Sequence, residues 1–145
     1  MSRDLDGYPL QRPKLLIADD DPVVRSMLGM SLDQRFEIVG AVEDSQQAVD
    51  IAKEHKPDAA LIDVDMPGGG GAAAVRGIAQ ASPETAIVVL SADESDAVVR
   101  DLLQAGAMTY RRKGISPQEL TETLESSIRA LRQEQAAVAT TPAER

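Results

Sequence analysis

Residues 14–33 of the 145-residue chain read KLLIADDDPVVRSMLGMSLD, and this stretch decides the fold. The run Lys14–Ala18 is apolar after its first residue and predicts a buried strand. Aspartates end the run, and Asp21 followed by a proline is typical of an N-cap and the first position of a helix. We therefore predict a helix over Pro22–Asp33 and, with it, a strand–turn–helix unit.

The same alternation recurs along the chain, because short apolar runs separate longer amphipathic stretches. Besides the first run, strands are predicted at Phe36–Val42, Ala59–Ile62, Ala86–Leu90 and Met108–Arg111. Besides the first helix, helices are predicted at Ser45–His55, Ala72–Ala81, Glu94–Ala105, which ends before a capping Gly106, and Pro117–Arg132. Five such units predict a single α/β domain with a doubly wound, five-stranded parallel sheet.

Composition excludes several classes of protein. Hydrophobic residues make up 43% of the chain and charged residues 27%, which is compatible with a folded core. A net charge of -9 argues against direct binding of nucleic acid by this chain. With no cysteine and one histidine, disulfides, thiol nucleophiles and Cys-rich or multi-histidine metal sites are excluded. Because no apolar segment has the length of a signal peptide or a membrane span, we expect a cytoplasmic protein without a membrane partner.

The periodic pattern covers the middle of the chain. Residues 1–13 are interpreted as an N-terminal extension, residues 14–134 as the folded domain and residues 135–145 as a tail or linker. Apolar periodicity is lost in that last segment, which is rich in Ala, Thr and Pro. Its composition fits both a stand-alone protein and the connection to a further domain.

Polar residues stand where the predicted strands end, and in a parallel sheet these ends share one edge, where ligands bind. Two carboxylates about 4 Å apart near a protein surface repel by roughly 4 kcal/mol, so a group of aspartates there indicates a bound cation. With oxygen ligands only, Mg²⁺ or Mn²⁺ fits best, and both ions accept phosphate oxygens. The residues at the strand ends are Asp19, Asp20, Asp63, Ser91 and Lys113.

Phosphoryl transfer is the chemistry that this set supports. Asp63 would act as the nucleophile, Lys113 would neutralise charge on the phosphoryl oxygens, and Ser91 would donate a hydrogen bond. Each residue alone has a plainer interpretation: a solvated turn for the aspartates, and a capping box with Glu94 for Ser91. Their joint occurrence at strand ends favours the functional interpretation, with Asp21 as the helix cap only.

Four motifs in this order resemble the receiver domain of two-component response regulators. They are LIADDDPVVR at 16–25, ALIDVDMPGGGG at 60–71, VVLSA at 88–92 and AGAMTYRRKG at 105–114. The resemblance covers nearly the whole chain and implies the flavodoxin-like (βα)5 fold of that family. It further implies that Asp63 is the phosphoacceptor, that Asp20 binds Mg²⁺ directly, and that Asp19 acts mainly through a coordinated water. The main-chain carbonyl of Asp65 would complete the protein ligands.

The resemblance also implies a signalling switch rather than an enzyme. A histidine kinase or phosphotransfer protein would supply the phosphoryl group, and the domain would catalyse its own phosphorylation and dephosphorylation. Ser91 would move to bond the phosphoryl group, Tyr110 would turn inward, and Lys113 would contact the phosphoryl oxygens. The changed surface would lie around the fourth helix and fifth strand and could support a homodimer. Neither the kinase nor the output domain or target is specified by the sequence.

Two features depart from the family pattern, and one motif supports another function. Gly114 stands after Lys113 where the family usually has proline, and the run Gly68–Gly71 predicts a mobile loop.

The alternative function is an aspartate-based phosphohydrolase, in which Asp63 and Asp65 form a nucleophile and general-acid pair. A third possibility, a degenerate receiver that only binds partners, is disfavoured because the expected site residues are present. In a receiver, Asp65 and Asp93 would flank the phosphoryl group and help to set its lifetime.

Overall fold

The computed structural model describes residues 11–66, 70–92 and 95–140. Within these ranges the strands are β1 (Lys14–Ala18), β2 (Glu37–Val42), β3 (Ala59–Asp63), β4 (Ala86–Ser91) and β5 (Thr109–Arg112). The helices are α1 (Pro22–Leu32), α2 (Ser45–His55), α3 (Gly70–Ala81), α4 (Asp96–Ala105) and α5 (Pro117–Thr140). The predicted alternation of strands and helices is confirmed.

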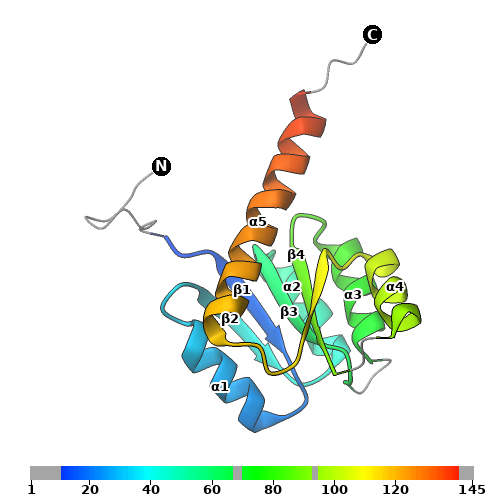
Figure 1. Cartoon of the computed structure of the whole chain (residues 1–145). Helices are drawn as coiled ribbons and strands as arrows, with labels where there is room; N and C mark the ends of the chain where they lie inside the picture. Colours follow the sequence, from blue (N-terminus) through cyan, green and yellow to red (C-terminus); the bar gives the residue numbers. More distant parts are fainter. Residues whose placement is uncertain (1–10, 67–69, 93–94, 141–145) are drawn as a thin grey trace.

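All the strands pair in parallel in one sheet, in the order β2-β1-β3-β4-β5. Helices α1 and α5 cover one face of the sheet, and α2, α3 and α4 cover the other (Figure 1). The strand order reverses at β1, so the connections from β1 and from β3 leave toward opposite faces and open a crevice at their carboxyl ends. The doubly wound, flavodoxin-like sheet is therefore confirmed. Its switch point lies between the ends of β1 and β3, where Asp19 follows β1 and Asp63 is the last residue of β3.

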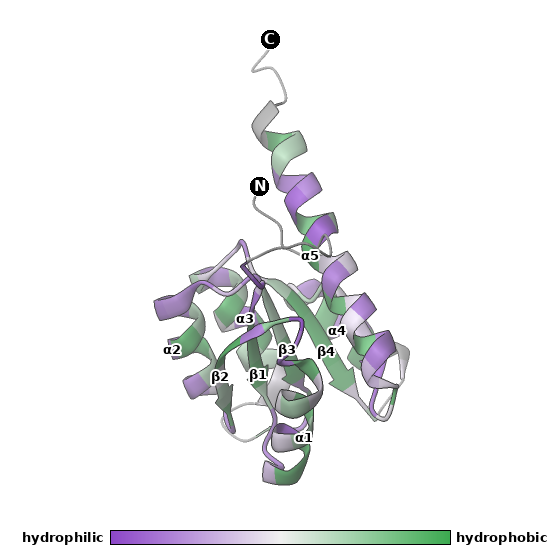
Figure 2. Cartoon of the chain, turned by 90° about the vertical axis from the view of Figure 1, so that its left-hand side faces the viewer, coloured by the Kyte–Doolittle hydropathy of each residue, from purple (hydrophilic) through white to green (hydrophobic). Residues whose placement is uncertain are grey.

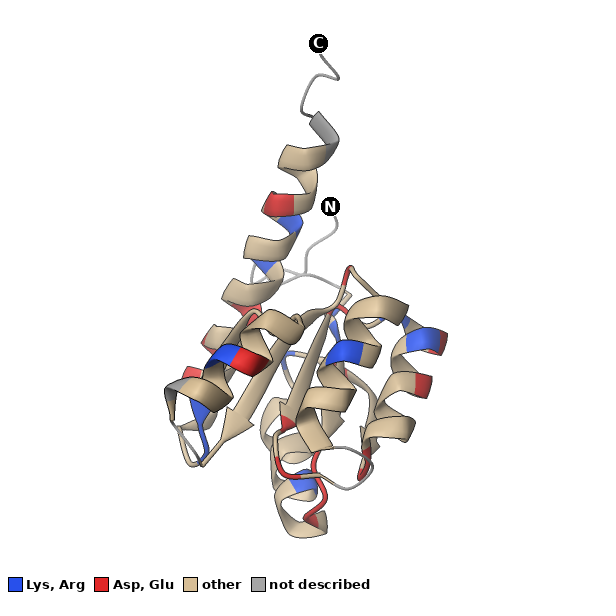
Figure 3. Ribbon diagram, turned by 90° about the vertical axis from the view of Figure 1, so that its right-hand side faces the viewer, with Lys and Arg blue, Asp and Glu red and all other residues tan. Residues whose placement is uncertain are grey.

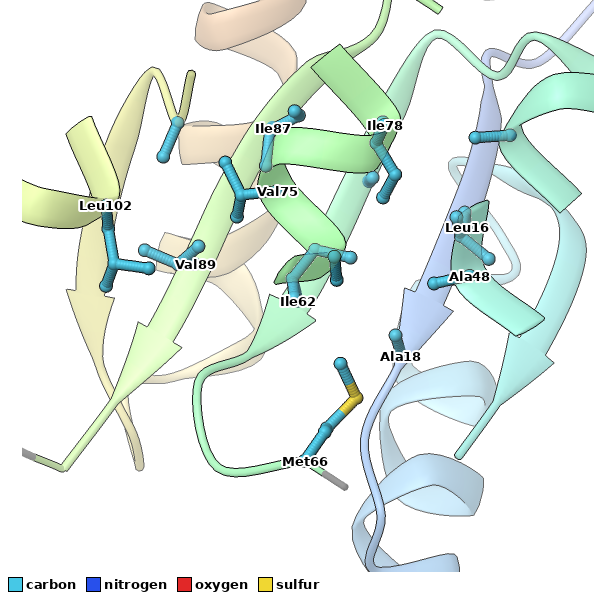
Figure 4. Close-up of a cluster of buried hydrophobic side chains, with 14 residues drawn as sticks. Leu16, Ala18, Ala48, Ile62, Met66, Val75, Ile78, Ile87, Val89 and Leu102 are labelled. Atoms are coloured by element: carbon cyan, nitrogen blue, oxygen red, sulfur yellow. The ribbon is translucent and has the colours of Figure 1, made fainter. Parts of the chain in front are cut away.

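Two apolar clusters sandwich the sheet, because successive side chains of each strand point to opposite faces. One cluster lies under α2, α3 and α4, where Leu16, Ile62 and Ile87 from the strands meet Val75 and Leu102 from the helices (Figure 4). The other lies under α1 and α5, and its largest fully buried side chain is that of Phe36. In Figure 2 strands β1, β3 and β4 are mainly hydrophobic, whereas hydrophobic and hydrophilic residues alternate along the helices. The core thus holds the sheet edge rigid where the polar residues meet.

The start of α1 follows the prediction closely. The Asp21 side chain accepts hydrogen bonds from the main-chain N–H groups of Val23 and Val24, at 2.9 and 3.4 Å, and Pro22 takes the first helical position. Asp21 is therefore the N-cap, as expected from the sequence. The predicted cap at the end of α4 is confirmed as well, since Gly106 has a φ of 128°, which favours glycine.

Two helices begin at other residues than predicted. Helix α4 begins at Asp96 with Ser95 as its N-cap residue, two residues later than predicted. The capping box that is the plainer interpretation of Ser91 involves Glu94, which lies outside the described residues. The run expected as a mobile loop partly belongs to α3, because Gly71 donates a 2.7 Å hydrogen bond to the Val64 carbonyl and begins the helix with Gly70. A Cβ atom at position 71 would lie 2.6 Å from the Val64 Cα, so only glycine fits; Gly68 and Gly69 lie outside the described residues.

Helix α5 is longer than its apolar pattern predicts, since it ends at Thr140 rather than at Arg132. Much of the segment interpreted as a tail or linker is therefore helical. Residues 133–137 read QEQAA, all favourable in helices, and two bonds hold the helix to the domain: Arg132 to Asp58 at 2.8 Å and Gln135 to the Pro83 carbonyl at 3.2 Å. Beyond them the helix projects from the domain (Figure 1), and Val138 is 74% exposed. No helix in the described ranges has the length and apolar content to cross a membrane.

Candidate functional site

Three carboxylates meet at the carboxyl ends of β1 and β3. Ligand oxygens of Asp19, Asp20 and Asp63 all lie within 4.8 Å of one another. The two strands are adjacent and in parallel register, with Ala18 opposite Ile62, so the residues that follow are brought side by side. Asp19 and Asp63 are buried, whereas Asp20 is exposed. Acidic residues accordingly gather in the loops at this edge of the sheet, at the lower end of Figure 3.

Lys113 reaches the cluster from the end of β5. Its Nζ lies 2.6 Å from Oδ1 of Asp63, and its main-chain N–H donates a 3.1 Å hydrogen bond to the Ser91 carbonyl. Burial alone lowers the pKa of Lys113, but the hydrogen bond to Asp63 and that carboxylate's charge raise it above the usual 10.5. The ammonium therefore stays protonated and balances one of the three carboxylates.

Two oxygens of the carboxylate group stay unpaired among the described residues. Oδ2 of Asp19 and Oδ2 of Asp63 are buried there without a hydrogen-bond partner. Burial raises the pKa of Asp19 above its usual 3.8, the charge of Asp63 raises it further, and the bond from Asp21 and the charge of Lys113 oppose this only in part. Buried, unpartnered carboxylate oxygens beside a third carboxylate are hard ligands with room for water, a set that fits Mg²⁺ or Mn²⁺.

The loop between β1 and α1 holds Asp19 in place. The Asp21 N–H donates a 2.9 Å hydrogen bond to Asp19 Oδ1, and Nη1 of Arg25 donates a 2.7 Å hydrogen bond to the Asp19 carbonyl. Asp21 lies outside the carboxylate group, as predicted. Arg25 was not among the predicted site residues. A signal was present, however, because a cation near the start of a helix opposes the helix dipole and needs a local reason.

The other candidate residues lie around this centre. Ser91 is the last residue of β4 and is 1% exposed; its neighbour Leu90 stands opposite Asp63 in the sheet. Tyr110, on β5 opposite Val89, is half-buried and packs against the cluster under α4. The Asp65 N–H lies 3.3 Å from Asp63 Oδ1 and its side chain is exposed, while Asp93 lies outside the described residues.

A cavity of about 480 Å³ opens beside the carboxylates, between α1 and the start of α5. Asp19, Asp20 and Lys113 form its polar end, and apolar side chains such as Met27 and Ile115 form the rest. The site is therefore an acidic pocket that can hold a cation. It lies next to a largely apolar cavity, and Lys113 is paired with its buried carboxylate Asp63.

Curated relatives match the larger part of the chain. The response regulator GacA of Pseudomonas aeruginosa is 34% identical over 113 residues, which cover 77% of this chain and 53% of GacA. The transcriptional regulatory protein PdtaR of Mycobacterium tuberculosis is 36% identical over 121 residues, which cover 83% of this chain and 58% of PdtaR. The chain thus spans about half the length of the curated relatives it matches.

Solved structures and a family profile agree with these relatives. The signal receiver domain of the putative response regulator NarL from Mycobacterium tuberculosis superposes with a TM-score of 0.78 at 26% identity, covering 82% of this chain and 98% of that domain. The response regulator domain of Thermotoga maritima CheB gives a TM-score of 0.70 at 27% identity, covering 83% and 96%. The profile of the response regulator receiver domain matches residues 15–125. The chain therefore belongs to the receiver domains of two-component response regulators, a family of signalling switches that work by phosphoryl transfer to an aspartate.

Proposed function

We propose that Asp63 is the phosphoacceptor of this receiver domain and that a histidine kinase or phosphotransfer protein is the donor. One observation carries the proposal: Lys113 holds the buried Asp63 carboxylate through one oxygen, and the other oxygen, beside Asp19, has no partner among the described residues. In the transfer, a carboxylate oxygen of Asp63 forms a bond to phosphorus as the phosphorus–nitrogen bond of a phosphohistidine breaks. The electron pair of that bond returns to the donor's imidazole.

Mg²⁺ is the cofactor that the oxygen ligands favour. Asp20, Asp63 and the main-chain carbonyl of Asp65 would hold the ion directly, and Asp19 would hold it through a coordinated water. When bound, the ion offsets the charge of the carboxylates and of the transferring phosphoryl oxygens. Mn²⁺ has the same ligand preferences and serves as a substitute.

The remaining residues would turn the transfer into a signal. The Lys113 ammonium, already at Asp63, would move onto a phosphoryl oxygen, and Ser91 would donate a hydrogen bond to another. Tyr110, half-buried between the end of the sheet and α4, would follow Ser91 inward and change the surface formed by α4 and β5. The domain would catalyse its own phosphorylation and hydrolysis. Phosphorylation would also promote a homodimer, and the output would lie in a further domain or a separate target.

Intact mass spectrometry tests the proposed chemistry. We expect the chain to gain the mass of one phosphoryl group within minutes of mixing with acetyl phosphate and Mg²⁺. No gain is expected when EDTA replaces Mg²⁺, because the crowded carboxylates then repel the anionic donor. An adduct of equal yield with and without Mg²⁺ would contradict a metal-dependent acceptor, and an absence of any adduct under both conditions would contradict phosphorylation from small donors.

Asp65 separates the switch from the alternative phosphohydrolase. In a phosphohydrolase, Asp65 would be the general acid, and Asp65→Asn would abolish steady turnover of an aryl phosphate. In the switch, Asp65 stands exposed two residues beyond Asp63, where its charge would bear on the water that attacks the phosphoryl group. We expect no sustained turnover of the aryl phosphate by the unchanged protein, and a several-fold change in the dephosphorylation rate in Asp65→Asn. An unaltered rate would show that Asp65 does not set the phosphoryl lifetime.

A further inference from the structure

Asp19 is anchored through all of its hydrogen-bonding groups but one. Its N–H donates to the Val42 carbonyl at 3.0 Å, and its Oδ1 accepts from the Asp21 N–H at 2.9 Å. Its carbonyl accepts from Nη1 of Arg25 at 2.7 Å, whereas its buried Oδ2 has no partner in the described part of the chain. The direction of that free oxygen is therefore set by three anchors, and Arg25 provides the one that is a side chain.

The bond from Arg25 also fixes Asp20. The Asp19 carbonyl belongs to the peptide plane that joins Asp19 to Asp20, and a peptide plane turns as a rigid unit. Without this bond the carbonyl would turn toward water. The peptide plane would rotate with it, and the side chains of Asp19 and Asp20 on either side of the plane would both shift. A charged donor at 2.7 Å makes a strong hydrogen bond to a carbonyl, so this contact resists such a rotation.

We propose that Arg25 is a positioning residue for the divalent cation: its guanidinium holds the Asp19–Asp20 peptide plane and so aims both carboxylates into the metal site. The inference rests on the proposed function, since it assigns Arg25 to the metal site of that function. Groups that orient metal ligands from behind affect affinity by about 10- to 100-fold when removed. Arg25 acts from outside the carboxylate group, through the main chain of Asp19.

We expect the fold to tolerate replacement of Arg25 by Ala. Arg25 also lines an open groove of about 660 Å³ between α1 and β2, so its truncation widens a solvent-facing groove and leaves no buried void. Arg12 lines the same groove, and its guanidinium donates to the main-chain carbonyls of Asp33 and Phe36 at the other end of α1. Arg12→Ala is thus a matched control, with the same residue type and the same kind of bond away from the carboxylates.

The test is the dissociation constant for Mg²⁺, measured by titration calorimetry on the full chain. We expect about tenfold weaker binding in Arg25→Ala, an intermediate value in Arg25→Lys, which keeps a charged donor, and an unchanged value in Arg12→Ala. Phosphorylation by acetyl phosphate should then need about tenfold more Mg²⁺ in Arg25→Ala and reach the unchanged protein's rate at saturation.

The outcomes separate this inference from the proposed function. Unchanged Mg²⁺ affinity in both Arg25 variants would overturn it, and so would an equal loss in Arg12→Ala, which would indicate a general effect of loosening α1. If Arg25→Ala shows no cooperative unfolding transition without metal, that variant is not folded. The Mg²⁺ affinity of Arg25→Lys, compared with that of Arg12→Ala, then decides. Failure of the unchanged protein to bind Mg²⁺ would instead contradict the proposed function.

Discussion

Replacement of Asp63 by Asn is expected to abolish phosphoryl incorporation from acetyl phosphate or a phosphohistidine donor. A neutral carboxamide is a poor nucleophile, so the rate should fall by at least about 10³-fold, to below detection. The fold should persist, because the Asn side chain has nearly the same volume and keeps an acceptor for Lys113 Nζ and the Asp65 N–H. Intact mass after incubation with Mg²⁺ and acetyl phosphate measures the effect.

Asp101→Asn serves as the matched control for this prediction. Asp101 is an exposed aspartate on α4, away from the strand ends, so the same chemical change there should leave the yield of adduct unaltered. A phosphoryl adduct of normal yield in Asp63→Asn would place the acceptor on another residue and would contradict the assignment of Asp63.

Replacement of Asp19 by Asn is expected to stabilise the metal-free protein and to abolish its stabilisation by Mg²⁺. Burial first, and the charge of Asp63 second, raise the pKa of Asp19 above its usual value. A carboxyl group with a raised pKa stabilises the fold below its unfolded pKa, and this stabilisation is lost as the pH rises through the folded pKa. At neutral pH in EDTA the variant should therefore be more stable, by on the order of 1 kcal/mol, or a Tm rise of roughly 3 °C.

Thermal unfolding from pH 4 to 8, with and without Mg²⁺, measures both parts of this prediction. In EDTA the two proteins should converge in acid and diverge as the pH rises. At an Mg²⁺ concentration about 100 times its dissociation constant, the unchanged protein should gain about 2.7 kcal/mol and Asp19→Asn almost nothing. Equal stability of the two proteins at every pH, or equal stabilisation by Mg²⁺, would show that Asp19 is neither a strained carboxylate nor part of the metal site.

The strands, the helices and the meeting of the site residues were predictable from the sequence because they depend on local patterns and one topological rule. Apolar runs between amphipathic stretches indicate strands and helices. Once the sheet is parallel, residues that directly follow adjacent strands must share an edge, which brings Asp19 and Asp63 together although they are far apart in the chain. The N-cap at Asp21 was predictable for the same local reason.

What could not be predicted depends on contacts with distant parts of the chain. Gly71 lies in the first turn of α3 instead of in a mobile loop because its backbone packs against Val64, which a run of glycines does not reveal. Helix α5 extends beyond the last apolar residue of its periodic pattern because Arg132 and Gln135 bond to Asp58 and Pro83. These two residues lie in loops that precede β3 and β4, at the end of the sheet away from the carboxylates. Arg25 has no motif of its own, since its role depends on a bond to a main-chain carbonyl.

The central claim, that the carboxylate of Asp63 receives the phosphoryl group, is tested most directly by locating the modification. Borohydride reduces an acyl phosphate to the alcohol, so a phosphorylated aspartate becomes homoserine, which tandem mass spectrometry places in the sequence. After treatment with Mg²⁺ and acetyl phosphate, followed by borohydride, we predict homoserine at position 63 alone. Homoserine at position 20 or 65, or a stable phosphate ester on Ser91, would contradict the account.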